Sequence, residues 1–552
     1  MTPAGLAAAR GLEPADAVFS GAEVFNPFAC SWERTDFAVK DGRIVGIGEY
    51  EGKREHDLSG AYVVPGLIDA HVHIESSLLA PAEYARLVLA HGTTTVIADP
   101  HEIANVCGAP GIDYMLAEGA RTPLDVLVML PSCVPATPFD KGGAVLTAAD
   151  LARFRGREGV VGLAEVMNVP GVLFGDEDLR AKMDLFEVID GHAPFLSGKD
   201  LNAYIYAGVQ SDHECTELSE AREKLLRGMY VMIREGSTEK NLRDLLPLVD
   251  ACTAPRCCFA TDDRHADMLA GEGHIDDCIR KAVACGLEVE QALRMATLSA
   301  AGRFGLHDRG VLAPGRLADF CVVDDPDRFR VLRTFKRGAE VIDAGYLPPA
   351  CPASPMHVRV PEPGDIRLAG RGEARVIGIV PGQITTREMR CSVDAAGIPD
   401  LDRDILKAVV TDRYRATGSG VGLVHGFHLQ EGAIAGSVSH DSHNIVAVGA
   451  GDADIVRAVA EVVRLGGGLA VVSGRDVTAL PLECAGLMSA LPYDEVVRRL
   501  AALEEHARRL GAIANPFMYL SFLALTVIPE IRVTERGVFD VGAFADVPLF
   551  EE

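Results

Sequence analysis

PGLIDAHVH, residues 65–73, ends a short apolar run with two histidines that are separated by one residue. Alternate side chains of an extended chain point the same way, so His71 and His73 face one side and can bind one metal ion. The apolar run that leads into them, residues 63–68, has the pattern of a strand. This stretch therefore predicts a strand whose carboxyl end carries a pair of metal ligands.

Seven further apolar runs follow, and amphipathic segments separate them. The runs lie at residues 95–99, 126–130, 160–166, 186–190, 208–211, 230–234 and 257–261. Segments between them, such as residues 81–90 and 218–226, have helical periodicity, and Gly92 and Gly228 occupy positions typical of helix ends. Strands that alternate with helices in this way predict an α/β protein built on a closed (β/α)8 TIM-like barrel, residues 65–310.

The segments that flank the barrel predict two more domains. Short β-like pieces occur on both sides of the barrel, so we expect residues 1–64 and 311–350 to form one composite β-sandwich domain. Residues 348–363 are rich in proline and predict a linker. Beyond the linker, residues 365–552 mix strand and helix patterns and predict an additional α+β C-terminal domain.

Polar residues lie at the ends of the predicted strands, where barrels of this class place their active sites. Glu165 lies on the fourth strand, His192 follows the fifth, His213 the sixth and Asp262 the eighth. Together with the two histidines of the first strand, they suffice for two divalent ions. Glu165 is the predicted bridge, because a carboxylate has two oxygens to share. Two ions would make hydroxide available as a nucleophile, and Asp262 could shuttle its proton.

Composition and charge exclude several classes of partner. A formal net charge of −26 argues against nucleic acid, because binding phosphates requires clustered Lys and Arg. Residues 1–10 lack the pattern of a targeting segment, and the apolar residues 517–528 are too few for a membrane span, so they predict buried core. Thirteen cysteines without repeated spacing predict reduced thiols. We therefore expect a cytoplasmic protein with no nucleic-acid or membrane partner.

A family resemblance rests on several of these segments together. The opening stretch resembles the signature of the amidohydrolase superfamily. Later segments resemble adenine deaminases of the bacterial type, namely HVHIESS (71–77), ADPHEIANV (98–106), GLAEVMNVPG (162–171), DGHAPFLSG (190–198), SDHE (211–214), TDDRH (261–265) and SVSHDSHN (437–444). The resemblance thus covers the whole barrel and extends into the C-terminal domain.

The resemblance implies an enzyme of purine salvage that hydrolyses adenine to hypoxanthine and ammonia by attack of a metal-bound hydroxide on C6. It implies two divalent ions, with Mn²⁺ preferred and Fe²⁺ or Zn²⁺ as alternatives. Many relatives in the superfamily bridge their metals with a carboxylated lysine, whereas adenine deaminases share the glutamate found here. The resemblance supports a ligand set of His71, His73, Glu165, His192, His213 and Asp262.

The implied reaction needs two proton transfers. We expect Asp262 to accept the proton of the attacking water and to pass it to the departing amine, because ammonia leaves poorly unless it is protonated. A second acid should protonate a ring nitrogen, and His101, Glu102 and Glu214 are the candidates near the rim. Glu102 has an equally good structural explanation as a charge at the start of a helix after Pro100.

A histidine-rich segment outside the barrel is a possible additional site. It contains His440, Asp441 and His443. These residues suit a further metal ion or a loop that closes over the substrate. A turn in which Asp441 and Ser442 bond to the backbone explains the same residues.

Two other functions stay open at this point. A different cyclic amidohydrolase on the same barrel would open a lactam or hydantoin-like ring with the same metal ligands. A non-catalytic barrel scaffold is the second alternative, although such proteins usually lack several ligands. We expect a homo-oligomer that acts on a small purine base.

Overall fold

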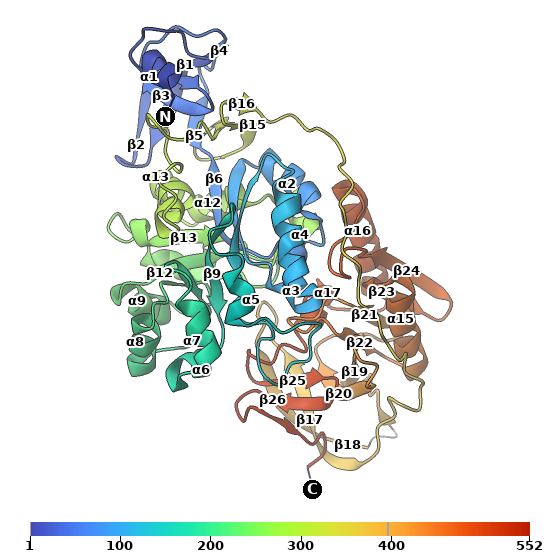
Figure 1. Ribbon diagram of the computed structural model, residues 1–552. Coiled ribbons are helices and arrows are strands. Elements are labelled where there is room, and N and C mark those ends of the chain that lie inside the picture. Colours follow the sequence, from blue (N-terminus) through green and yellow to red (C-terminus); the bar gives the residue numbers. More distant parts are fainter. Residues whose placement is uncertain (1, 395–396, 552) are drawn as a thin grey trace.

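The computed structural model describes residues 2–394 and 397–551 (Figure 1). A β domain that contains the N-terminus lies at one end of a central barrel, and the C-terminal domain, coloured orange to red, packs along the barrel's side. The predicted fold class, a TIM-like barrel with a β domain and an added C-terminal domain, is confirmed.

Eight parallel strands form the barrel, and hydrogen bonds close it. The first five share one sheet in chain order and the last three share another. The backbone N–H of Gln210 donates to Ile189 O at 3.1 Å and joins the two sheets, and the N–H of Asp262 donates to His71 O at 3.0 Å and closes the ring. The strands are β6 (Leu67–Val72), β7 (Thr93–Ala98), β8 (Asp125–Leu130), β9 (Val160–Val166), β10 (Ile189–Gly191), β11 (Ser211–Asp212), β12 (Tyr230–Arg234) and β13 (Cys257–Ala260).

Helices connect the barrel strands and surround them. The segments expected to be helical at residues 81–90 and 218–226 are helices with those bounds. The described helices of this part are α2 (Pro81–Ala90), α3 (His101–Cys107), α4 (Ala109–Gly119), α5 (Ala148–Ala152), α6 (Val169–Phe174), α7 (Glu177–Met183), α8 (Gly198–Tyr206), α9 (Leu218–Leu226), α10 (Leu242–Leu245), α11 (Ala266–Gly271), α12 (Ile275–Ala284), α13 (Val289–Arg294) and α14 (Ala300–Arg303).

The first predicted strand is in fact divided between two domains. Residues Tyr62–Pro65 form β5 of the β domain, and β6 of the barrel begins at Leu67. Gly66 lies between them and packs tightly, since a Cβ there would lie only 2.2 Å from Thr94 Oγ1. The chain therefore passes from one domain into the other at a glycine, a break that an apolar run alone does not reveal.

Strands from both flanks of the barrel build one β sheet. β5 pairs with β1 in parallel and with β14 in antiparallel fashion, so residues before and after the barrel share this sheet. Four phenylalanine rings pack in its core: Phe19 stacks on Phe37, Phe320 stacks on Phe335, and the two pairs meet edge to face. The strands are β1 (Ala17–Asn26), β2 (Ser31–Lys40), β3 (Arg43–Ile47), β4 (Glu55–Asp57), β5 (Tyr62–Pro65), β14 (Phe320–Val323), β15 (Val331–Lys336) and β16 (Ala339–Glu340), and α1 (Pro3–Ala9) precedes them.

The C-terminal domain is built on one large sheet with the order β18-β17-β20-β19-β22-β21-β23-β24. Its strands are β17 (Arg371–Ile379), β18 (Thr386–Asp394), β19 (Leu406–Thr411), β20 (Ser419–His425), β21 (Ala433–Gly436), β22 (Ile445–Gly449), β23 (Gly468–Ser473) and β24 (Asp476–Pro481). A small sheet and three helices complete it, namely β25 (Ile531–Thr534), β26 (Gly537–Asp540), β27 (Ala545–Val547), α15 (Asp452–Leu465), α16 (Tyr493–Arg509) and α17 (Pro516–Ser521).

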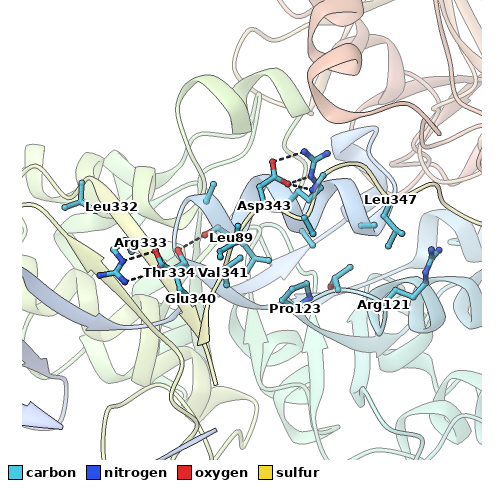
Figure 2. A pocket seen from close by; sticks show the side chains of 18 residues that line it. Leu89, Arg121, Pro123, Leu332, Arg333, Thr334, Glu340, Val341, Asp343 and Leu347 are labelled. Atoms are coloured by element: carbon cyan, nitrogen blue, oxygen red, sulfur yellow. Dashed lines mark hydrogen bonds and ion pairs between the residues drawn. The ribbon is translucent and has the colours of Figure 1, made fainter. Parts of the chain in front are cut away.

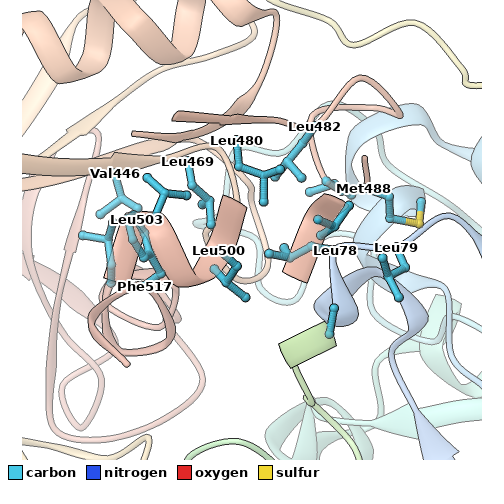
Figure 3. Close-up of a cluster of buried hydrophobic side chains, with 14 of the residues drawn as sticks. Leu78, Leu79, Val446, Leu469, Leu480, Leu482, Met488, Leu500, Leu503 and Phe517 are labelled. Carbon is cyan, nitrogen blue, oxygen red and sulfur yellow. The ribbon is translucent and has the colours of Figure 1, made fainter. Parts of the chain in front are cut away.

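The C-terminal domain and the barrel share an apolar core (Figure 3). Leu78 and Leu79, which follow the first metal-ligand strand, belong to the same buried cluster as Leu482 and Leu500 of the C-terminal domain. The N–H of Ser489 also donates to Leu78 O at 2.8 Å. A shared core of this kind holds the two domains in one relative position, because separating them would expose apolar surface to water.

The expectation that the cysteines are reduced thiols is wrong for two of them. A disulfide joins Cys351 to Cys484, with the two Cα atoms 4.4 Å apart, so not every thiol is reduced. The bond ties the proline-rich linker to the C-terminal domain. Sequence spacing could not reveal the pair, because 133 residues separate its members. Among the described residues, no helix is long and apolar enough to cross a membrane.

A buried lysine fixes the loops after β10 and β11. The Lys224 ammonium is fully buried and lies 3.0 Å from Asp212 Oδ2, 2.7 Å from Glu220 Oε1 and 2.6 Å from Ala193 O. Asp212 in turn accepts the N–H of Ala193. The loops that follow these two strands are therefore held together by one charge.

We expect Lys224→Met to destabilise the barrel by about 3–5 kcal/mol, because it leaves the Asp212 carboxylate buried and unpaired. Thermal unfolding followed by circular dichroism should show a midpoint lower by roughly 6 °C or more. Lys199→Met, at an exposed position on α8, is the control and should leave the midpoint unchanged. An unchanged midpoint for Lys224→Met would contradict this role.

Candidate metal centre

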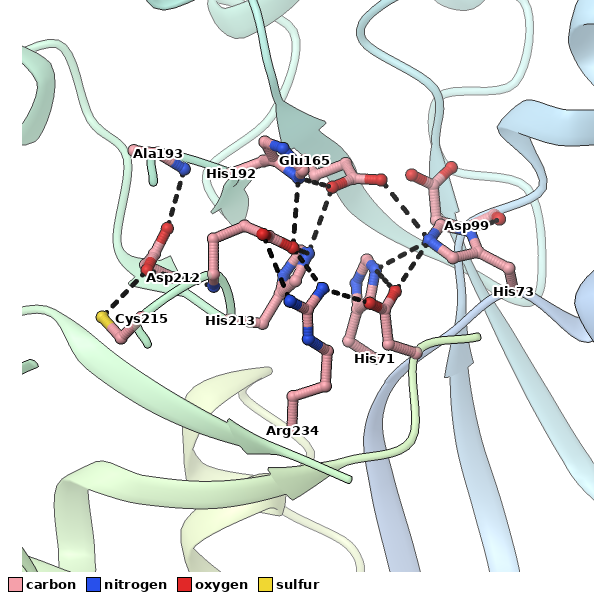
Figure 4. A network of polar contacts seen from close by, with 12 residues as sticks. His71, His73, Asp99, Glu165, His192, Ala193, Asp212, His213, Cys215 and Arg234 are labelled. Atoms are coloured by element: carbon pink, nitrogen blue, oxygen red, sulfur yellow. Dashed lines mark hydrogen bonds and ion pairs between the residues drawn. The ribbon is translucent and has the colours of Figure 1, made fainter. Parts of the chain in front are cut away.

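Residues from both ends of the barrel sequence meet at one rim (Figure 4). His71 Nε2 lies 3.2 Å from His73 Nε2 and 3.6 Å from Asp262 Oδ1. His73 Nε2 lies 3.1 Å from the same Asp262 oxygen and 3.4 Å from Glu165 Oε1. The first and eighth strands are neighbours in the closed barrel, which brings Asp262 beside the two histidines.

The other oxygen of Glu165 faces two more histidines. Glu165 Oε2 lies 2.7 Å from His192 Nδ1 and 3.2 Å from His213 Nε2. The carboxylate therefore has one oxygen toward each half of the cluster, as a bridging ligand requires. All six side chains are buried.

The donor set fits divalent cations. Donor atoms that bind one ion at roughly 2.1 Å lie about 3.0–3.4 Å apart, close to the separations in this cluster. Two groups of side chains each have candidate ligand atoms that all lie within 4.8 Å of one another. One group is His71, His213 and Asp262, and the other is Glu165, His192 and His213. Imidazole and carboxylate together suit Mn²⁺, Fe²⁺ and Zn²⁺.

Burial and neighbouring charges shift the pKa values of these groups in different directions. Burial dominates for His71 and places the pKa of its imidazole well below the usual range. Burial lowers the pKa of His73, but the hydrogen bond to Asp262 and the nearby carboxylate charges together outweigh it and raise this pKa well above the usual range. Burial opposes ionisation of Glu165, but His192 and His213 outweigh it and hold the pKa of the carboxyl well below its usual range. Opposite charges explain the shifts of His73 and Glu165, whereas burial explains that of His71.

Arg234, at the end of β12, is a residue that the sequence did not assign. Its Nη1 lies 2.6 Å from Asp262 Oδ2 and also contacts Glu214 Oε1, while Nη2 lies 3.3 Å from Glu214 Oε2. Burial opposes ionisation of Asp262, but Arg234 and the neighbouring histidines together outweigh it and hold the pKa of the carboxyl well below its usual range. Glu214 Oε1 lies 3.5 Å from His213 Nε2. The only sequence signal was an arginine closing an apolar strand.

Hydrogen bonds that involve the backbone orient two of the candidate ligands, His73 and His192. His73 Nδ1 lies 2.9 Å from Asp99 O, at the end of the neighbouring strand β7. This contact assigns the proton to Nδ1 and leaves Nε2 free to face Asp262. His192 is placed by its backbone N–H, which donates to Tyr204 Oη at 3.1 Å.

His101 and Glu102 lie beside this centre, at the start of α3. His101 Nδ1 lies 3.0 Å from Asp99 Oδ2 and 3.3 Å from Glu165 Oε1. His101 Nε2 lies 3.1 Å from Glu102 Oε1 and 3.5 Å from Asp441 Oδ1. The structure thus brings two of the three predicted second acids next to the histidine-rich segment of the C-terminal domain.

A separate cavity of about 320 Å³ lies away from these residues (Figure 2). It is formed by α2, β15 and the chain after β16, and an ion pair between Arg86 and Asp343 at 2.8 Å borders it. None of the predicted site residues lines it. This cavity is therefore separate from the candidate metal centre at the barrel rim.

Comparisons with known proteins agree with this geometry. Residues 62–341 match the model of the Amidohydrolase family, and residues 383–545 match that of the Adenine deaminase C-terminal domain. The chain is 93% identical over 517 residues to an adenine deaminase of Methanoculleus marisnigri, covering 94% of this chain and 100% of that protein. It is 61% identical over 547 residues to an adenine deaminase of Methanoregula boonei, covering 98% of each. The chain therefore belongs to the adenine deaminase family of amidohydrolases.

Proposed function

We propose that this protein hydrolyses adenine to hypoxanthine and ammonia in purine salvage. Its family membership supports the substrate, since relatives that match nearly its whole length are named adenine deaminases. The observation that best supports a metal-dependent hydrolysis is the position of the Glu165 carboxylate. One of its oxygens faces His73, and the other faces both His192 and His213.

The same residues support a binuclear centre. We assign one divalent ion to His71, His73, Asp262 and Glu165, and the other to Glu165, His192 and His213, with Mn²⁺ preferred over Fe²⁺ and Zn²⁺. When bound, the ions supply Lewis acidity and lower the pKa of water so that it can act as a nucleophile near neutral pH.

Asp262 is placed to handle the first proton. Its Oδ2 is held by Arg234, whereas its Oδ1 faces His71 and His73. We assign Asp262 as the acceptor of the proton from the attacking water and as its donor to the departing amine. This transfer lets the leaving group depart as ammonia.

The second proton is assigned to the pair of His101 and Glu102. Of the three candidates, Glu214 is occupied by Arg234, which contacts both oxygens of its carboxylate. His101 Nε2 and Glu102 Oε1 lie 3.1 Å apart, a distance at which they can share a proton. We propose that this proton goes to a ring nitrogen of the purine during addition at C6.

The remaining features support a cytoplasmic homo-oligomer without nucleic-acid or membrane partners. The net charge of −26 disfavours phosphate-rich partners. Phe174 on α6 and Tyr206 on α8 are 88% and 94% exposed. Exposed aromatic side chains on neighbouring helices support an interface between copies of the chain.

We expect the purified protein, supplied with Mn²⁺, to release ammonia from adenine faster than from adenosine, cytosine, guanine or a hydantoin. Removing the metal with a chelator should abolish the release, and adding Mn²⁺ back should restore it. A coupled assay for ammonia measures both. Ring opening of the hydantoin without deamination of adenine would reject this function, and full activity after metal removal would reject the mechanism.

Glu165→Gln should lower the bound metal below the about two ions per chain expected of a binuclear site, because an amide bridges two cations poorly. Elemental analysis by mass spectrometry measures the metal, and the ammonia assay should show activity lost with it. Glu158→Gln changes an exposed glutamate just before the same strand and is the matched control. Full metal content in Glu165→Gln would show that this carboxylate does not bridge.

A further inference from the structure

Glu102 lies at the junction of the barrel and the C-terminal domain, and imidazoles from both domains surround it. Its Oε1 lies 2.5 Å from His440 Nδ1, and its Oε2 contacts His443 Nε2. On the barrel side, His101 Nε2 lies 3.1 Å from Oε1. Glu102 is only 1% exposed, so water does not replace these partners.

The C-terminal domain determines which nitrogen of His443 carries its proton. The backbone N–H of Ser439 donates to His443 Nδ1 at 3.2 Å, so this nitrogen is the acceptor. In a neutral imidazole the proton is then on Nε2, the atom that faces Glu102. His443 is therefore prepared to donate an N–H to the carboxylate.

His440 is held just as firmly, by the apolar segment near the end of the chain. Its ring stacks on Phe522 with centroids 4.5 Å apart and planes inclined by 14°. Its backbone N–H donates to Ser521 O at 2.8 Å. Residues 517–528, expected from sequence as buried core, thus support a side chain that reaches the barrel rim.

We propose that His440 and His443 are positioning residues of the C-terminal domain, which hold the Glu102 carboxylate by one oxygen each and so complete the active site of the barrel. The inference rests on the proposed function, in which Glu102 and His101 share the proton for the substrate. With an imidazole against each oxygen, the carboxylate has little room to rotate or to move away from His101. Small displacements of a proton-transfer group are costly, and an error of about 1 Å lowers rates roughly 10²-fold.

The test compares two substitutions at His443. His443→Phe keeps a ring but removes the N–H, and we expect kcat for adenine to fall roughly 10²-fold while KM changes little. His443→Gln places an amide N–H near the position of Nε2, so it should recover a large part of the lost kcat. Bound metal should equal that of the wild type in both variants.

A matched control separates positioning from general damage to the domain. His506, on α16 of the same domain, is 5% exposed, and its Nδ1 lies 2.9 Å from Thr478 Oγ1. His506→Phe should leave kcat and KM unchanged. If His443→Phe does not fold, His440→Phe and His440→Asn give the same comparison, since the amide of Asn lies near the position of Nδ1.

Three results would overturn the proposal. Wild-type kcat in His443→Phe would mean that Glu102 needs no second domain to hold it. Equal loss of kcat in the Phe and Gln variants would mean that the N–H is not what matters. Loss of metal from these variants would make the cluster a cation site instead. If the wild type leaves adenine unchanged, the proposed function fails, and the variants are then compared on whichever panel substrate it turns over.

Discussion

The Glu165 carboxylate sets the central constraint on this structure, because its two oxygens must each meet a separate group of donors within a water-poor interior. Carboxylates and imidazoles buried together are costly unless opposite charges compensate them. A closed barrel meets this demand by bringing the ends of eight strands to one rim. His73 from the first strand and His213 after the sixth thereby reach the same side chain.

Buried basic side chains pair with the other carboxylates near the ends of the barrel strands. Arg234 pairs with Asp262 and Glu214, Lys224 with Asp212, and Arg303 with Asp190 at 2.5 Å. Each of these carboxylates lies within one residue of a barrel strand's end or in the loop that follows it. The basic residues therefore do more than balance charge, since each one fixes a segment that carries a candidate metal ligand or lies next to one. These ion pairs therefore help to hold the candidate ligands close together through the protein's own contacts.

Sequence patterns could predict the barrel and its candidate ligands because both are local. A strand with HxH at its end is visible in nine residues, Glu165 lies within an apolar run, and Asp262 follows another. Arg234 has no comparable signature, since an arginine after a strand serves many structural purposes. The contact between Glu102 and His440 spans 338 residues, so no spacing rule could reveal it. The same holds for the pairing of Cys351 with Cys484.

The barrel and the C-terminal domain meet next to the candidate site. The chain after His73 enters the shared core through Leu78 and Leu79, so the C-terminal domain packs against the segment that follows a candidate metal ligand. The same domain reaches Glu102, whose neighbour His101 lies 3.3 Å from Glu165. A displacement of this domain would therefore disturb His101, Glu102 and the candidate metal centre together. A barrel with open strand ends could bind the same ions, but it would leave Glu102 in water, where a carboxylate is free to turn and its proton is shared with solvent.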